Sequence, residues 1–311
     1  MVEIAVRAPH GLFGQGASAL AAFGEAVDAS GLDRVWVGDH VSFRGGAGQD
    51  GLLTTMALAA VTRRVQLQTA VYLLPLRHPV PVARQVAGIA ELAPGRFVFG
   101  VGIGGEDPLE VRNCGVDPAT RGRRTDASLE VVRRLLEGEV LDGGDYDLEQ
   151  AAIRPTPSVP VPVIVGGRSA AALRRAGRLA DGWLGIWVDP DRFAASVAEV
   201  ERVAAESGRA GVPWDHGFMA WCGIGESRVE ARGRLAEAME SFYGVAFERF
   251  ERSSPVGTPS DIADALEPYV VAGAQSILLS PIGPEPEQAL ELVAEVKLEL
   301  ERRCGGVGAR P

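Results

Sequence analysis

Short runs of apolar and β-branched residues alternate with longer segments of helical periodicity along the whole chain. This alternation predicts parallel strands joined by crossover helices, because parallel neighbours need a long return connection. Helical spacing is clearest near the C-terminus, where one face collects Ala289, Leu292, Val293, Val296 and Leu300. The strands are expected at residues 3–8, 34–40, 65–73, 97–102, 161–166, 182–188, 217–224 and 276–281.

Eight strand–helix repeats in 311 residues favour one closed (β/α)8 TIM barrel, an α/β fold that spans residues 1–311 as a single domain. An open doubly wound sheet is the alternative, although it usually needs fewer strands. The longest interruption covers residues 139–160, which contain Gly143, Gly144 and several prolines. We interpret this stretch as an insertion before the fifth strand that holds a small hairpin.

The formal net charge of −10 at pH 7 disfavours a nucleic-acid partner, because that binding depends on phosphate neutralisation. No stretch approaches the roughly 18 consecutive apolar residues of a membrane span, and the first residues lack a signal-peptide pattern. Cys114, Cys222 and Cys304 are odd in number and far apart, so they fit neither a disulfide framework nor a metal site. The sequence therefore predicts a cytoplasmic protein without a metal centre.

Reactive groups of such barrels come from the loops that follow the strands, so chemistry is expected at the predicted strand ends. Polar, titratable and aromatic residues stand at these ends and would converge on one rim, as a cavity for a planar cofactor requires. The residues expected to contact a substrate are His10, Tyr72, Trp187 and Trp221. At the same strand ends, the residues expected to contact the cofactor are Asp39, Thr69, Ala70, Val71, Gly102 and Gly104.

The best candidate for a phosphate site follows the fifth predicted strand and consists of Gly166, Gly167, Arg168 and Ser169. Paired glycines let the backbone approach an anion, and Ser169 can cap a helix whose free N–H groups would face the phosphate. A plain tight turn is the other interpretation. The stretch 100–105 also matches GxGxxG, but a loop rather than a helix follows it, so we do not interpret it as a dinucleotide site.

His40, which follows Asp39 at the end of the second predicted strand, is the candidate acid/base group. A histidine suits this role because its unperturbed pKa lies near neutrality. On position alone, a Gly-Asp-His tail that merely caps the loop is an equally good explanation.

Several segments carry a family resemblance when they are taken together and in order. They are GLDRVWVGDH (31–40), LLPLRHPV (73–80), APGRF (93–97), RGRR (121–124), VGG (165–167), ADGW (180–183) and GTP (257–259). Through them the chain resembles the bacterial-luciferase-like superfamily over nearly its whole length. Within that superfamily it is similar to the branch that uses the deazaflavin coenzyme F420.

The resemblance implies a barrel with a cofactor ring across its mouth and a non-prolyl cis peptide, here at Ala70–Val71, behind that ring. It implies a cofactor phosphate at Gly166 and Gly167 and a histidine near the reacting carbon, which His40 matches. A loop acid of the sugar-phosphate enzymes in this branch is matched only approximately, by Glu106. Those enzymes hold their substrate phosphate with lysines, and this chain has none suitably placed. Many relatives are homodimers through their second and third helices.

Together, the residues and the resemblance predict an oxidoreductase that passes a hydride between coenzyme F420 and a small organic substrate. His40 would move the accompanying proton, Asp39 would position His40, and Glu106 is the third catalytic candidate. The alternatives are an FMN-dependent luciferase-like monooxygenase and a non-catalytic flavin-binding barrel.

Overall fold

Eight parallel strands close into a barrel in the computed structural model, which describes residues 2–105, 107–283 and 285–304. The strands are β1 (Glu3–Arg7), β2 (Arg34–Val37), β5 (Gln66–Thr69), β7 (Phe97–Gly102), β10 (Val163–Gly166), β11 (Gly182–Ile186), β12 (Gly217–Ile224) and β14 (Ser276–Ile282). Each pairs with the next in parallel, and β14 returns to pair with β1. The predicted (β/α)8 barrel is therefore confirmed, with a strand in each expected place.

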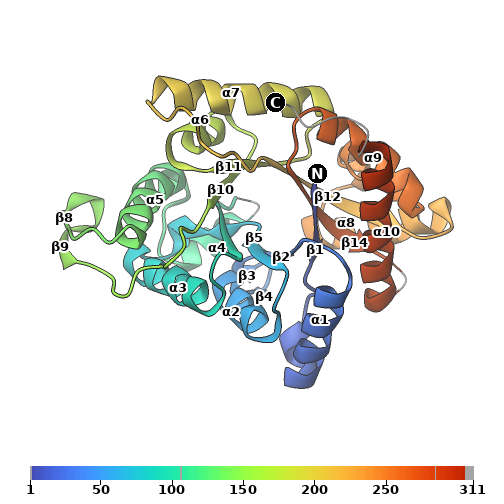
Figure 1. Cartoon of the computed structure of the whole chain (residues 1–311), viewed down its shortest axis with the longest axis horizontal. Coiled ribbons are helices and arrows are strands. Elements are labelled where there is room, and N and C mark those ends of the chain that lie inside the picture. The colour runs from blue at the N-terminus through green and yellow to red at the C-terminus, as the bar shows by residue number, and fades with distance from the viewer. Residues whose placement is uncertain (1, 106, 284, 305–311) are drawn as a thin grey trace.

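Helices surround the barrel on its outside (Figure 1). They are α1 (Ala17–Ala29), α2 (Gly51–Val61), α3 (Pro79–Leu92), α5 (Arg121–Leu136), α6 (Ala170–Leu179), α7 (Pro190–Glu206), α8 (Arg228–Tyr243), α9 (Pro259–Val271) and α10 (Pro286–Cys304), with a short α4 (Pro108–Asn113). Helix α9 shows how local sequence sets a helix start, because Thr258 and Asp261 form a reciprocal capping box. None of the helices in the described part of the chain could cross a membrane.

The core has two layers because successive side chains of a strand point to opposite faces. The larger layer lies between the strands and the helices. The smaller layer fills the barrel interior and consists of Ala5, Trp36, Ala70, Val98, Ile164, Leu184 and Leu278. Two residues beyond Ala5 and Leu278, the same alternation directs Arg7 and Ser280 toward the interior near the C-terminal ends of the strands. The middle of the barrel interior is thus filled by apolar side chains, and polar side chains follow near the C-terminal ends of the strands.

The second and third expected strands are interrupted next to predicted cofactor contacts, at Asp39 and at Ala70–Val71, and the backbone changes direction at both places. The second ends at Val37, and His40 instead begins an antiparallel hairpin of β3 (His40–Phe43) and β4 (Ala47–Gln49). The third divides into β5 and the short β6 (Tyr72–Leu73), with the predicted cis peptide between Ala70 and Val71. The first interruption takes the chain out of the barrel sheet into a separate hairpin, whereas β6 still pairs with β7 in the barrel sheet.

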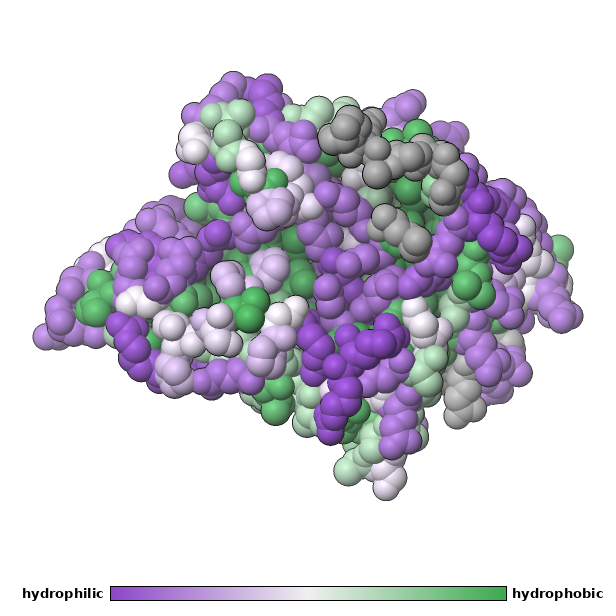
Figure 2. Space-filling view, viewed as in Figure 1, coloured by the Kyte–Doolittle hydropathy of each residue, from purple (hydrophilic) through white to green (hydrophobic). Residues whose placement is uncertain are grey.

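Two smaller features lie outside the barrel wall. An antiparallel hairpin of β8 (Leu141–Gly143) and β9 (Leu148–Ala151) lies between α5 and β10, inside the stretch 139–160, and stands at the edge of the molecule in Figure 1. The short β13 (Val256–Gly257) pairs with the end of β12. Hydrophilic residues dominate the face drawn in Figure 2, as expected for helices whose apolar sides are turned to the strands.

At the N-terminal ends of the strands, a buried arginine is fully compensated by charge. Arg34 donates to Asp215 at 2.6 Å and to Gln68 at 3.1 Å, and it also pairs with Glu3. Asp215 accepts a further hydrogen bond from Ser276 at 3.1 Å. This network closes the end of the barrel opposite to the predicted site.

A buried histidine should make the fold sensitive to acid. His216 is almost fully buried, stacks on Trp214 and accepts a hydrogen bond from the Trp183 backbone N–H at 3.2 Å. Burial lowers the pKa of His216 to about 4, whereas an unfolded histidine titrates near 6.5. As the pH falls from about 6.5 to 4, the unfolded chain gains a proton that the folded chain resists, so the fold loses up to about 3 kcal/mol.

We therefore expect His216→Gln to flatten this dependence. Urea unfolding between pH 7.5 and 4.5 would measure the free energy of unfolding for the parent and for His216→Gln. Parallel curves for the two proteins would show that the acid sensitivity comes from other groups.

Candidate functional site

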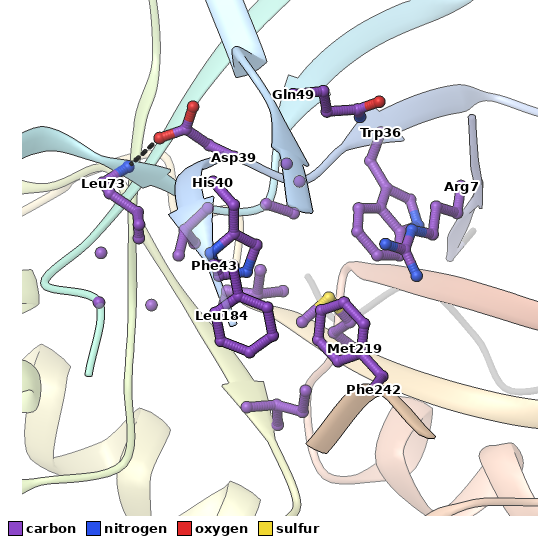
Figure 3. Close-up of a pocket in the computed structure, with 18 of the residues that line it drawn as sticks. Arg7, Trp36, Asp39, His40, Phe43, Gln49, Leu73, Leu184, Met219 and Phe242 are labelled. Carbon is purple, nitrogen blue, oxygen red and sulfur yellow. Dashed lines mark hydrogen bonds between the residues drawn. The ribbon is translucent and has the colours of Figure 1, made fainter. Parts of the chain in front are cut away.

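A cavity of about 450 Å³ opens at the C-terminal ends of the barrel strands. It receives residues that are far apart in sequence, since every strand end of a closed barrel faces the same axis. The predicted site residues that line it are His10, Asp39, His40, Ala70, Val71, Gly102, Gly104, Gly166, Gly167, Trp187 and Trp221. Figure 3 shows part of this cavity, with His40 near its centre and Arg7 beside Trp36 on the side away from Asp39 and Leu73.

Two predicted residues lie in the core instead of the cavity. Thr69 is buried and donates its hydroxyl to the Gly100 carbonyl at 2.7 Å. Tyr72, expected to contact the substrate, is buried between Phe99 and the Arg77 guanidinium. Because neighbouring residues of a strand face opposite sides, Val71 takes the cavity position and Tyr72 turns outward. Tyr72, predicted as a substrate contact, therefore lies outside the lining of this cavity.

Arg168 and Ser169 are exposed beside the cavity and are not part of its lining. Ser169 caps α6 as predicted, because its Oγ accepts the Ala172 N–H at 3.2 Å. Arg168 lies over the ring of Trp187, 5.2 Å from its centre. Glu106, the predicted loop acid, lies outside the described residues.

The Asp39 carboxylate, which we expected to position His40, is hydrogen-bonded to groups other than the His40 ring. Its side chain is fully buried, and its two oxygens accept the backbone N–H groups of Gly51 and Leu73, both at 2.9 Å, and a two-pronged contact from Arg77 at 2.5 and 2.9 Å. Burial raises the pKa of Asp39, and Arg77 and the two backbone donors oppose that rise. Asp39 thus joins the start of α2 to the end of the third strand.

The partner of His40 is Glu110, which the sequence did not reveal. His40 Nδ1 lies 3.0 and 3.3 Å from the two Glu110 carboxylate oxygens. Glu110 is only 3% exposed and also accepts the backbone N–H groups of Val41 at 2.6 Å and Ser42 at 3.2 Å. With Nδ1 donating to this carboxylate, Nε2 is the nitrogen left to exchange a proton with a bound molecule.

Local sequence explains why Glu110 was missed. It stands in the first turn of α4, just after the N-cap residue Asp107 and Pro108. Acids are common at that place because they complement the helix dipole, so the pattern has a sufficient structural explanation. Only the fold shows that α4 packs against the β3–β4 hairpin and directs this acid at His40.

Aromatic rings form one side of the cavity, and we call Phe43, Trp187, Trp221, Phe242 and Tyr243 the aromatic wall. The rings of Phe43 and Phe242 stack with centres 5.1 Å apart, and His40 lies 4.3 Å from Phe43. Phe43 comes from the β3–β4 hairpin and Phe242 from the end of α8, after the seventh strand, so their meeting depends on barrel closure. The wall gives His40 an apolar surrounding.

Another part of the cavity lining consists of Val71, Gly102 and Gly166, and we call it the glycine floor because a side chain at either glycine would collide with Val71. Val71 lies over Gly102 and Gly166, where an added Cβ would stand 2.3 and 2.8 Å from the Val71 methyl groups. Beyond Gly166, Gly167 has φ +130° and leads to α6, which begins at Ala170. The first amides of a helix have no partner inside it and favour an anion. These residues fit a flat ring on the floor with a phosphate at the start of α6.

Comparison with known proteins agrees with this geometry. The family model of luciferase-like monooxygenases matches residues 3–295. The chain belongs to this family. Among the described residues, no group of three or more side chains could hold a metal ion.

Curated relatives include both dehydrogenases and monooxygenases. An F420-dependent glucose-6-phosphate dehydrogenase of Nakamurella multipartita is 34% identical over 178 residues, 54% of this chain and 52% of that protein. A 4-hydroxyprotoasukamycin monooxygenase of Streptomyces nodosus subsp. asukaensis is 31% identical over 247 residues, 76% of this chain and 65% of that protein. These matches span between about half and two thirds of the relatives' own length.

A solved structure covers the fold more completely. An F420-dependent secondary alcohol dehydrogenase, in complex with an F420-acetone adduct, superposes with a TM-score of 0.83 over 96% of this chain and 99% of its own. The identity is 20%, so this likeness shows the shared barrel alone.

Asp39 joins the start of α2 to the end of the third strand, and we call it a structural hub for this reason. This assignment can be tested by measuring the free energy of unfolding. Asp39→Asn keeps the side-chain volume but leaves the Arg77 cation without its main partner, so the free energy of unfolding should fall by roughly 3 kcal/mol. The matched control is Asp107→Asn, which alters an exposed N-cap and should cost less. Urea denaturation would measure both. Equal losses in the two variants would contradict the hub assignment.

Proposed function

We propose that the chain is an F420-dependent oxidoreductase that transfers a hydride between the deazaflavin and a small organic substrate. The proposal rests mainly on one observation: His40, which is hydrogen-bonded to Glu110, and a glycine floor that ends at a helix N-terminus line the same cavity. Family membership supports a flavin-type cofactor, and the F420-dependent glucose-6-phosphate dehydrogenases among the relatives favour the deazaflavin.

The floor would hold the cofactor. Val71, Gly102 and Gly166 would lie against the ring, while Gly167 and the first amides of α6 would receive the phosphate. When bound, a deazaflavin supplies a ring carbon that accepts or gives up a hydride. The residues of this chain would orient the two reactants and move the proton.

His40 would exchange the substrate proton at Nε2. Its Nδ1–H would stay bonded to Glu110, whose carboxylate orients the ring and stabilises the imidazolium that forms when a proton arrives. The Val41 and Ser42 amides hold Glu110 in place. The aromatic wall would exclude water from the reacting groups, which strengthens these interactions. In this arrangement Glu110 takes the positioning role that we first expected of Asp39.

The second candidate is an FMN-dependent monooxygenase. The monooxygenase relative favours it, because its match covers more of this chain than that of the glucose-6-phosphate dehydrogenase. The same floor and helix start would suit FMN, because the ring and phosphate of FMN are similar in shape to those of F420. Direct binding of the two cofactors separates the candidates.

Equilibrium titration of the cofactor-free chain should show F420 binding at least tenfold more tightly than FMN. Gly166→Ala should weaken that binding by roughly tenfold or more, because its Cβ would displace Val71 from the floor. The matched control is Gly14→Ala, which adds the same methyl group in open space. Fluorescence would follow both titrations. Tight binding of FMN alone would replace our proposal with the monooxygenase.

The proton role predicts a separation of turnover from binding. A panel of alcohols, aldehydes and carboxylates would first identify a substrate by the change in F420 absorbance. His40→Ala should then lower kcat by roughly 10²–10⁴-fold while F420 affinity changes less than about twofold. Glu110→Gln should lower kcat less than His40→Ala, because the amide oxygen still accepts the Nδ1–H. Unchanged turnover in His40→Ala would exclude it as the acid/base group.

A further inference from the structure

Arg7 is a partly buried cation in the cavity, and the reaction described above does not use it. It is the last residue of β1, and the strand alternation that places Ala5 in the barrel interior also turns Arg7 inward. Its guanidinium lies between two indoles, 5.4 Å from the Trp36 ring centre and 5.1 Å from that of Trp221. Figure 3 shows it beside Trp36 at the cavity edge.

Within the described chain Arg7 has no counter-ion. Nη1 donates to Ser280 Oγ at 3.2 Å, Nη2 contacts the His10 ring, and the buried Nε has no hydrogen-bond partner among the described residues. Arg34, at the other end of the same barrel, differs from Arg7 because it is paired with two carboxylates, Glu3 and Asp215. A partly buried cation with an unsatisfied Nε and no anion beside it is costly, so the fold keeps an unfavourable charge at the site.

The surroundings leave this charge positive at neutral pH. Burial lowers the pKa of Arg7 to about 10, which is still well above 7. Burial, Arg7 and His40 together lower the pKa of His10 to about 4, so His10 is neutral and acts as an acceptor. Asp39 also lines the cavity, but its carboxylate is already neutralised by Arg77. Arg7 is the only arginine or lysine among the described residues of the lining.

Arg7 stands apart from the place proposed for the cofactor phosphate. Going round the barrel in either direction, β1 and β10 are four strands apart, so Arg7 and Gly166 lie on opposite walls. On the Arg7 side, the His10 ring that Arg7 contacts lies 6.4 Å from the ring of Phe242, which in turn lies 6.0 Å from the His40 ring. An anion at Arg7 would therefore share the cavity with His40 and would lie on the opposite wall from Gly166.

We propose that Arg7 binds the carboxylate of a flat, largely apolar substrate whose body packs against the aromatic wall. A planar guanidinium pairs well with a carboxylate, and one cation balances one negative charge, whereas a phosphate dianion would leave a charge over. The proposal deepens the proposed function and rests on it only for what happens to the substrate after binding.

The test uses benzoate and its neutral counterpart benzamide with the whole chain free of cofactor. Isothermal titration calorimetry should show benzoate binding at least tenfold more tightly than benzamide. Arg7→Met should remove at least tenfold of the benzoate affinity and change that of benzamide by less than twofold. The charge control is Arg44→Gln, since Arg44 is exposed next to Phe43 and outside the lining, and it should keep the preference. Equal binding of the two probes, or an equal loss in Arg44→Gln, would overturn the proposal.

Folding is checked on the same variants. Removing an uncompensated cation should leave the melting temperature of Arg7→Met unchanged or raised, and Arg7→Lys should retain part of the benzoate preference. A large fall in melting temperature in both variants would mark Arg7 as a structural residue and would overturn the proposal.

A last arm separates the substrate from the cofactor as the source of the anion. Benzoate should still bind when F420 is present, and Arg7→Met should keep F420 affinity within about twofold. If F420 excludes benzoate and Arg7→Met weakens F420 tenfold, Arg7 serves the cofactor and our proposal is wrong. If benzoate preference holds but neither F420 nor FMN binds, the proposed function fails while the carboxylate site stands.

Discussion

Closure of the sheet between β14 and β1 is the constraint on which the site depends. Until Glu3 pairs with Ser276, the first and last strands are free edges, and residues such as Arg7 and Ser280 have no reason to meet. Once the barrel closes, every strand end faces one axis and each loop delivers its side chains to the same small volume. The barrel topology therefore determines where the cavity lies, and a few side chains at the strand ends determine its chemistry.

Inside that frame, the ion pair of Asp39 and Arg77 sets the shape of the mouth. Asp39 also binds the amides of Gly51 and Leu73, so one buried carboxylate joins the start of α2 to the end of the third strand. This contact turns the chain after β2 and releases His40 into a hairpin, where Glu110 can reach it. Two neighbouring residues, Asp39 and His40, thus have separate partners, Arg77 and Glu110, and only His40 is assigned a chemical role in our proposal.

The sequence could predict the barrel because periodicity is a local property, repeated eight times. It could also predict residues that touch the cavity through the backbone, such as Gly166, Gly167 and Val71, because glycine pairs and strand ends are visible locally. It could not predict which side of the third strand Tyr72 occupies, because Ala70 and Val71 both line the cavity and so break the regular alternation before Tyr72. Glu110 and Phe242 were out of reach for another reason: each is typical of its own helix, and only tertiary packing turns it toward His40.

Arg34 and Arg7 stand at opposite ends of the barrel interior, and they differ in how their charges are balanced. Arg34 has carboxylates on both sides and closes the bottom, where no ligand needs access. Arg7 lies among indoles, a serine and a neutral histidine, an environment that supports the flat face of a guanidinium but does not balance its charge. An acid beside Arg7 would make the fold more stable and would fill the position with a permanent partner. In our proposal, the missing partner leaves a place open for a negatively charged ligand, in the same cavity as His40, to which we assign the proton transfer.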